Sequence, residues 1–510
     1  MKFNRTKNTL RNSFWGFFNQ IIQNLLPFIT RTLLIKLLGA EYLGLNSLFA
    51  SILQFLNLAE AGFGVAIVYS MYKPIADNDK NAICALLNLF RKIYRIVGFI
   101  VLCVGLLILP FLKLFIKADY PSDINIYLLY CIYLSNSVLS YFLFAYKNSL
   151  FNAFQRNDKL SQIDTFISIF KPVVQIIILL FFKNIYVYTI IIPFMTITKN
   201  ITVSVLASKV YPEYVCKGFI AKEQKKDIYK KTLGLFISKI SQTTRDSFDS
   251  IFISYFIGLI TVTVYSNYYY IMNAVHGFLH IICISMTAGV GNFIANENKD
   301  KVKELFNNIN FLYMVISGWC FVCLMVLYQP FMNIWVGNEL MFNTKGVVLI
   351  CIYFYLLTMG DIKGVFSGAF GMWWDFKYCS AIEAFSNLFL NFILARKFGI
   401  YGILLGTTIN LFAINFIFTS YILFKKHFSI KSFFLYLFDH LKYFAVTLAI
   451  SFLLNIFIKK FIFEYSIANF IIKILICFIF VPVVYFFIFS YKIKRNEVVK
   501  RLLNKIRKQN

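Results

Sequence analysis

The sequence predicts an all-α, polytopic membrane protein with about 14 transmembrane helices, arranged as two six-helix lobes of parallel repeats plus two C-terminal helices. Three observations predict this fold: continuous apolar stretches of spanning length, a hydrophobic content of 59% and a second half that repeats the first. A hydrocarbon core about 30 Å thick needs about 20 apolar residues in a helix, and only helices or closed barrels satisfy all backbone polar groups in lipid. Long unbroken runs favour helices over barrel strands.

The predicted helices follow one another with short loops, none of which could hold a soluble domain. They span residues 12–38, 43–72, 93–116, 124–147, 160–182, 185–209, 233–257, 262–290, 307–336, 346–368, 376–397, 401–424, 440–463 and 467–491.

Composition and charge exclude a soluble protein and a nucleic-acid partner. Only 15% of the residues are charged, against about 25% in soluble domains. The net charge of +28 arises from Lys and Arg that gather in alternate loops, which is the pattern of cytoplasmic loops in a membrane protein. These loops include the N-terminal segment, residues 73–92, the basic segment 217–231, residues 299–303 and 425–426. Both termini are therefore expected in the cytoplasm.

The C-terminal tail, 492–510, combines basic residues with Val and Leu at helical spacing. This pattern predicts an amphipathic helix on anionic lipid of the inner leaflet. The alternative is a solvated tail that only fixes the topology.

An internal repeat relates the two halves. A shift of 219 residues places Gly39 on Gly258 and lays IADNDK, residues 75–80, over IANENK, residues 294–299. The shift carries the first predicted helix onto the seventh, so both halves have the same orientation and a pseudo-twofold axis along the membrane normal is expected. Alternating access between two lobes is then the natural motion.

The repeat sets the predicted domain boundaries. They are an N-lobe at 1–209, a cytoplasmic basic linker at 210–232, a C-lobe at 233–424, two further helices at 425–491 and the tail at 492–510.

Polar residues interrupt the first predicted helix along one stripe. Gln20, Asn24 and Arg31 recur at helical spacing within an otherwise apolar span. A charge inside a membrane helix costs at least about 2.5–3.5 kcal/mol, so it is expected to face water or a partner. A guanidinium matches phosphate oxygens in a two-pronged geometry, so Arg31 is predicted to bind an anionic substrate. The alternative is an ion pair with Glu60.

The seventh predicted helix carries a second stripe, formed by Lys239, Gln242, Asp246 and Asp249, with Arg245 one turn from Asp249. Because the repeat matches these two helices, both stripes are expected to line the cleft between the lobes. Lys239, Arg245 and Gln242 are predicted to join the substrate site, unless Arg245 simply pairs with Asp249. Asp246 and Asp249, together with Glu60 of the second helix, are candidates for binding a coupling cation or proton.

Further intramembrane charges are Asp164, Lys171, Asp361, Lys363 and Glu383, and some of them are expected to pair between neighbouring helices. His276 and His280 lie one turn apart without a neighbouring carboxylate in the sequence, so a packed or cavity-lining pair is predicted rather than a metal site. No catalytic residue, metal or cofactor is predicted, and the protein is not expected to be an enzyme.

Residues 30–76 resemble the opening two helices of the bacterial polysaccharide transporter family, a branch of the multidrug/oligosaccharidyl-lipid/polysaccharide exporter superfamily. The resemblance rests on Arg31, on Leu38-Gly39 followed by Tyr42-Leu43-Gly44, and on the segment from Glu60 to Gly64. The second half departs from this pattern, since Thr263 replaces Gly44 and Cys283 replaces Gly64.

The resemblance implies a Wzx-type flippase of the bacterial cytoplasmic membrane. Its substrate would be an oligosaccharide repeat unit on undecaprenyl pyrophosphate, moved to the outer leaflet for capsule or O-antigen-type polysaccharide, and a polysaccharide polymerase is a candidate partner. A drug or cation exporter of the same superfamily is the first alternative, although three cationic candidates favour an anionic cargo. A membrane polymerase or ligase is the second, but the external loops are short.

Overall fold

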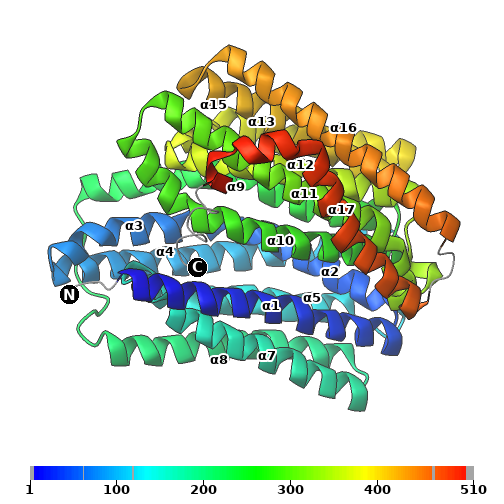
Figure 1. Ribbon diagram of the computed structural model, residues 1–510. Helices are drawn as coiled ribbons and strands as arrows, with labels where there is room; N and C mark the ends of the chain where they lie inside the picture. Colours follow the sequence, from blue (N-terminus) through cyan, green and yellow to red (C-terminus); the bar gives the residue numbers. More distant parts are fainter. Residues whose placement is uncertain (1–4, 61, 118–119, 462–465, 501–510) are drawn as a thin grey trace. The chain divides into compact units, whose positions relative to one another are not determined.

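The computed structural model describes residues 5–60, 62–117, 120–461 and 466–500, and within these ranges the chain forms helices and no strand. This confirms the all-α prediction (Figure 1). The α-helices are α1 (Arg5–Leu37), α2 (Ala40–Leu56), α3 (Phe63–Ala76), α4 (Lys80–Ile108), α5 (Ile126–Phe142), α6 (Asn148–Ala153), α7 (Asn157–Phe181), α8 (Ile185–Val210), α9 (Lys222–Phe256), α10 (Leu259–Asn296), α11 (Lys299–Val336), α12 (Thr344–Ala369), α13 (Lys377–Phe398), α14 (Ile400–Asn410), α15 (Thr419–His427), α16 (Ile430–Phe461) and α17 (Ile467–Arg495). Short 3-10 turns and one π-helical segment, Leu411–Phe418, connect some of them.

Eleven helical segments of the described chain are long and apolar enough to span a membrane, or up to 12 if the bent pair formed by α5 and residues 145–153 is one span. The helices α1 and α9, of 33 and 35 residues, are long enough but more polar. Counting them would give the predicted 14. α1 and α9 are thus less apolar because they contain the predicted polar stripes.

Helix boundaries differ from the predictions where the backbone turns. The second predicted helix is broken into α2, a 3-10 turn at Asn57–Glu60 and α3, because Gly62 adopts a left-handed conformation with φ 93°. The predicted fourth helix bends by 51° after Phe142. The seventh begins at Lys222, so residues 222–231 of the basic segment form the first turns of α9 and residues 211–221 connect it to α8.

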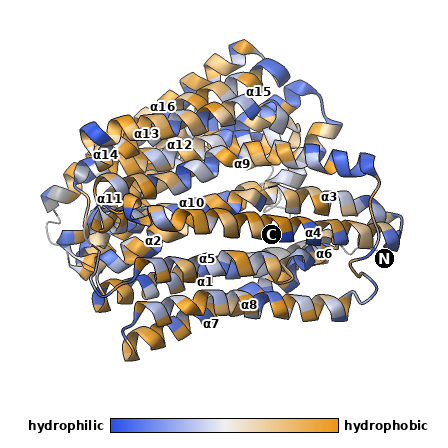
Figure 2. Cartoon of the chain, turned by 180° about the vertical axis from the view of Figure 1, so that it is seen from behind, coloured by the Kyte–Doolittle hydropathy of each residue, from blue (hydrophilic) through white to orange (hydrophobic). Residues whose placement is uncertain are grey.

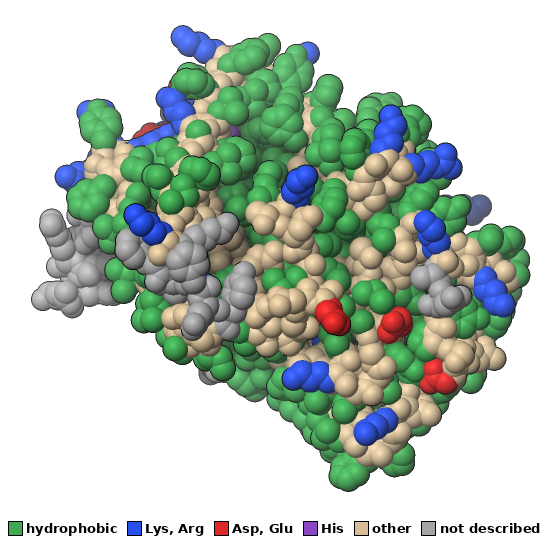
Figure 3. Space-filling view, turned by 90° about the vertical axis from the view of Figure 1, so that its right-hand side faces the viewer, with side chains coloured by type: hydrophobic (Ala, Val, Ile, Leu, Met, Phe, Trp, Pro, Cys, Tyr) green, Lys and Arg blue, Asp and Glu red, His purple; other side chains and the backbone are tan. Residues whose placement is uncertain are grey.

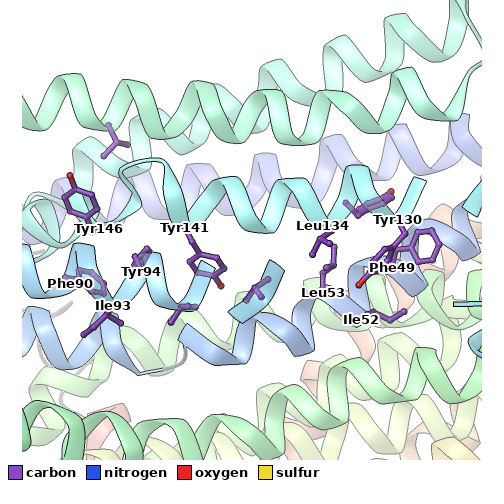
Figure 4. Packing of buried hydrophobic residues seen from close by; sticks show 14 of the residues in the cluster. Phe49, Ile52, Leu53, Phe90, Ile93, Tyr94, Tyr130, Leu134, Tyr141 and Tyr146 are labelled. Carbon is purple, nitrogen blue, oxygen red and sulfur yellow. The ribbon is translucent and has the colours of Figure 1, made fainter. Parts of the chain in front are cut away.

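The first compact unit, Met1–Thr263, contains α1 to α9 and the start of α10. Its core is aromatic and aliphatic, with Phe49 of α2 edge-on to Tyr130 of α5 and Tyr94 of α4 edge-on to Tyr141 (Figure 4). The Tyr130 hydroxyl donates to the Gly105 carbonyl, so the ring is buried without losing its hydrogen bond. α9 packs on α2 and α3, although the repeat assigns it to the second half. The lobe boundaries derived from the repeat stay a prediction.

The second compact unit, Val264–Asn510, includes a core formed where α11 packs against α16 and α17. Val322, Ile450, Leu454, Cys477 and Val481 are buried there. Beyond α17, Asn496 accepts from the amides of Val498 and Val499 and so caps a further helical turn. The rest of the predicted amphipathic tail, 501–510, lies outside the described residues.

Large apolar side chains cover much of the exterior. Phe181, Phe385, Phe487 and Leu107 are each more than two-thirds exposed. The ribbon coloured by hydropathy is apolar along most helices, and the space-filling face shows green side chains interrupted by scattered charges (Figures 2 and 3). In water so much exposed apolar surface would cause aggregation, whereas in a membrane the lipid chains solvate it. The chain is therefore a multi-pass membrane protein.

The repeat is visible in the backbone at the predicted spacing. Gly39 and Gly258 both have positive φ, 126° and 136°, at the junctions that precede α2 and α10. Their amides donate to Leu34 and Ile253, which are also 219 residues apart. Downstream, Asp79 and Asn298 cap α4 and α11 in the same way, each accepting from the amide three residues on. The two halves thus share local geometry as well as letters.

A reciprocal contact joins the starts of α2 and α10. A Cβ added to Gly44 would lie 2.4 Å from the Leu259 carbonyl oxygen, while the Thr263 hydroxyl donates to the Ala40 carbonyl. The shift of 219 turns Gly44 into Thr263 and Ala40 into Leu259. Exchanging the two halves therefore maps this contact onto itself, as a twofold relation requires.

Candidate functional site

The first polar stripe lies on α1, which packs along α7 (Figure 1). Gln20, Asn24 and Arg31 are all half-buried there. Arg31 lies near the Tyr188 hydroxyl of α8, so a phenol accompanies the guanidinium. The three side chains share one helix and are neither sealed in the core nor fully exposed, as a site for a polar ligand requires.

The second stripe runs along α9 and becomes more buried toward its C-terminal end. Lys239 and Gln242 are exposed, Asp246 is about one-fifth exposed and Asp249 is fully buried. Arg245 is buried as well, with its Nε 3.6 Å from Asp246 Oδ1. The stripe thus offers an accessible cation at one end and a buried cluster of opposite charges at the other. The alternative pairing of Arg245 with Asp249 stays a prediction.

Glu60 lies in the 3-10 turn between α2 and α3, where Tyr94 of α4 donates a hydrogen bond to its Oε1. Asn57 of the same turn accepts from Tyr141 of α5 at 3.1 Å and contacts Ser137. The break at Gly62 therefore positions a carboxylate and an amide against two other helices. The Glu60 to Arg31 pair remains an untested alternative.

All nine residues predicted for substrate or ion binding belong to the first unit. The structure places eight of them on α1 and α9, two helices that the repeat relates, and Gln20 and Lys239 occupy equivalent positions under the 219-residue shift.

Some of the other intramembrane charges have partners on neighbouring helices, as predicted. Lys199 of α8 lies 2.6 Å from Asp164 of α7. Lys363 of α12 is buried and donates to the Asn415 carbonyl and the Thr419 hydroxyl. Asn415 lies inside the π-helical segment, whose irregular hydrogen bonding leaves carbonyl groups available for such a donor.

One pairing was missed from the sequence. His276 Nε2 lies 3.0 Å from Asp361 Oδ2, although the two residues are 85 positions apart. The spacing of His276 and His280 does not predict this contact, because it depends on how α10 packs against α12. In the part of the chain that the structure describes, no group of three or more His, Cys, Asp or Glu is placed to hold a metal ion.

The described residues thus combine a membrane-spanning body with polar stripes and buried ion pairs. Comparison with protein families then decides the class: a family described as polysaccharide biosynthesis protein matches residues 9–288. The chain belongs to this family. The matched region begins in α1 and ends in α10, so it includes every predicted substrate and ion-binding residue.

Solved structures show the same fold. The inward closed conformation of the lipid II flippase MurJ matches with a TM-score of 0.65 and 18% identity over 95% of this chain and 99% of that one. An inward-facing multidrug resistance MATE family transporter of the MOP superfamily matches with a TM-score of 0.61 and 15% identity, covering 78% and 93%. A MOP superfamily transporter from Pyrococcus furiosus gives 0.55 and 14%, covering 81% and 94%. The search of curated proteins gave no match.

These comparisons confirm the predicted family and fold. Because the structural matches are below 25% identity, they show the fold alone. The substrate has to be inferred from the chemistry of the polar residues.

Proposed function

We propose that the protein is a flippase that moves an oligosaccharide repeat unit linked to undecaprenyl pyrophosphate from the inner to the outer leaflet of a bacterial cytoplasmic membrane. One observation carries the proposal: α1 and α9, two long helices that are more polar than the other candidate spans, contain the cationic residues Arg31, Lys239 and Arg245 in a chain of the polysaccharide biosynthesis family. Cationic groups within long helices of a membrane protein favour a cargo with an anionic head group.

Each polar residue of the stripes has a role in this proposal. Arg31 and Lys239 receive the diphosphate, Arg31 through its planar fork and Lys239 as a mobile point charge. Gln20, Asn24 and Gln242 bind sugar hydroxyls. Arg245 adds positive charge from the buried end of α9.

Asp246, Asp249 and Glu60 are proposed to bind a coupling ion within the first unit, since an intramembrane carboxylate can exchange a proton or cation as access alternates. No covalent step is required of the protein, and no cofactor enters the proposal.

The proposed orientation follows the basic loops, with both termini in the cytoplasm. The product would feed capsule or O-antigen-type polysaccharide, and a polymerase that consumes it on the outer face is a proposed partner. The basic C-terminal segment is proposed to lie on anionic inner-leaflet lipid.

An ion-coupled multidrug exporter is the second candidate, favoured by the likeness to MATE family transporters. A cationic drug would find its charge opposed by Arg31 and Lys239, so the charge of the stripes favours the lipid-linked cargo. A polysaccharide polymerase or ligase is the weaker third candidate.

Depletion of the protein in its host tests the proposal. Lipid-linked oligosaccharide should accumulate on the inner leaflet while surface polysaccharide falls, and a plasmid copy should reverse both. Unchanged surface polysaccharide without accumulation, together with increased sensitivity to cationic drugs, would contradict the flippase and support the exporter.

A further inference from the structure

The second unit contains a hydrogen-bonded cluster that joins three helices. Asp361 of α12 contacts His276 of α10 at 3.0 Å through its Oδ2, and the same oxygen accepts from the Tyr313 hydroxyl of α11. The His276 and Asp361 side chains are only 18% and 11% exposed. An imidazole held against a carboxylate inside a membrane can bind and release a proton at physiological pH, which few other side chains do.

The equivalent place in the first half lacks this chemistry. The shift of 219 residues places Asn57 on His276 and Tyr94 on Tyr313. Tyr94 also donates to a carboxylate, that of Glu60 in the 3-10 turn of the first half. The position equivalent to Glu60 in the second half is Leu279, which has no carboxylate. The amide of Asn57 cannot titrate. The frame is therefore shared, and the titratable imidazole is specific to the second half.

Other titratable and charged groups lie around His276 and Asp361. On α10, His280 is exposed and the Cys283 thiol lies beside Tyr313 and Asp361. On α12, the ammonium of Lys363 is near Asp361 but is bound to Asn415 and Thr419. From α13 and α16, Glu383 and His440 face Lys363.

We propose that His276 and Asp361, oriented by Tyr313, form the proton-binding site through which a proton gradient drives the transport cycle. The inference rests on the proposed flippase function but places the proton outside the carboxylates of the first unit. With the proton bound, imidazolium and carboxylate tie α10 to α12 as an ion pair. When the proton leaves His276 Nε2, the attraction between the two side chains weakens, and Asp361 keeps its hydrogen bond from Tyr313 and the nearby ammonium of Lys363.

A proton fits the cluster better than a metal ion. A transition metal takes three or four ligands, whereas one Asp361 oxygen here already serves both the imidazole and the phenol. A two-state tie between helices is the kind of element that a ligand can bias.

The first test measures the proton without any cargo. The chain has four histidines, so the protein labelled with ¹⁵N-histidine in lipid nanodiscs should give few imidazole signals, and His276→Gln assigns one of them. We expect this imidazole to gain and lose one proton as the pH is varied, and we expect Asp361→Asn to change the chemical shift of its signal, because the contact with the carboxylate is lost. A His276 signal that stays in one protonation state at every pH would overturn the proposal.

The second test couples the proton to transport. Vesicles containing the protein and lipid-linked oligosaccharide from the host receive a pH gradient, a sodium gradient or none. The pH gradient should speed translocation at least about tenfold in wild type and in His280→Gln, the matched control one turn away, and should have no effect in His276→Gln. Gradient dependence that survives in His276→Gln, or stimulation by sodium alone, would overturn the proposal. If wild type titrates but moves no lipid-linked sugar, the proposed flippase fails while the proton site stands.

Discussion

The second transmembrane segment of each half has the same starting point and a different course. In the first half it breaks into α2, a 3-10 turn and α3 at Gly62, whereas in the second half α10 continues unbroken for 38 residues, with Ile281 at the position of Gly62. The break places Glu60 and Asn57 against α4 and α5. The continuous helix instead carries His276 to α12. A duplicated frame has thus acquired a different polar cluster in each half.

The stripes show the same divergence. Gln20 of α1 corresponds to Lys239 of α9, and Arg31 corresponds to Ser250. The positive charges are therefore not duplicated, and each half contributes its own. If the head group is held by both stripes, changes at equivalent positions should have unequal effects.

Removing the Arg31 charge should have the largest effect. Arg31→Ala should reduce transport at least about 100-fold, equivalent to about 2.7 kcal/mol, while membrane abundance stays near normal. Arg31→Lys should keep partial activity, because Lys retains the charge without the two-pronged geometry. Surface polysaccharide per unit of membrane protein measures both.

Ser250→Ala is the matched control at the repeat-equivalent position and should keep most activity. Full activity of Arg31→Ala would remove this residue from the site. Recovery in the double variant Arg31→Ala with Glu60→Ala would instead show that the guanidinium only neutralises Glu60.

Gly44→Ala should destabilise the fold by about 2–3 kcal/mol, because the new Cβ would meet the Leu259 carbonyl, a backbone atom that cannot move aside. Ala is otherwise the better helix former, so the expected sign is opposite to its propensity. Gly64→Ala is the control, since its Cβ would make an ordinary contact with Phe90. Thermal unfolding in detergent measures both, and equal melting temperatures would contradict the close approach of the two helix starts.

Gly39→Ala and Gly258→Ala should each cost about 1–3 kcal/mol and by similar amounts, because both glycines hold positive φ that residues with a Cβ avoid. Thermal unfolding of the two single variants tests the equivalence. A large loss in one and none in the other would show that the shared geometry is not a shared constraint.

Thr263→Val should have the smallest effect, about 1 kcal/mol, through loss of the hydrogen bond to the Ala40 carbonyl. Thr287→Val on the same helix, where the hydroxyl bonds only within α10, is the control for the change in side chain. Identical melting temperatures of the two variants would show that the reciprocal contact does not depend on this hydroxyl.

The sequence predicted the helical fold and the repeat because apolar length and spacing are local signals. Gly39 and Gly258, which the repeat aligns, also share a backbone conformation with positive φ. The break at Gly62 was missed because the hydrophobic pattern runs through it, and the early start of α9 was missed because its first turns are polar. The pairing of His276 with Asp361 depends on how α10 packs against α12, which no spacing in the sequence encodes.

The candidate site was predicted in part. The residues of α1 and α9 could be singled out because a charge within an apolar span is visible in the letters. Their differing burial, from exposed Lys239 to buried Asp249, follows from the packing of α9 on α2 and α3 and could not be derived from the stripe alone.

Translocation in reconstituted vesicles tests the central claim most directly. Lipid-linked oligosaccharide isolated from the host is incorporated with the purified protein, and its access to membrane-impermeant periodate is followed over time. We predict that the initially protected half becomes oxidised at least about ten times faster with the wild type than in protein-free vesicles, and that Arg31→Ala abolishes the difference. Rates equal to those of protein-free vesicles, with uptake of a cationic dye by the same preparation, would contradict the flippase.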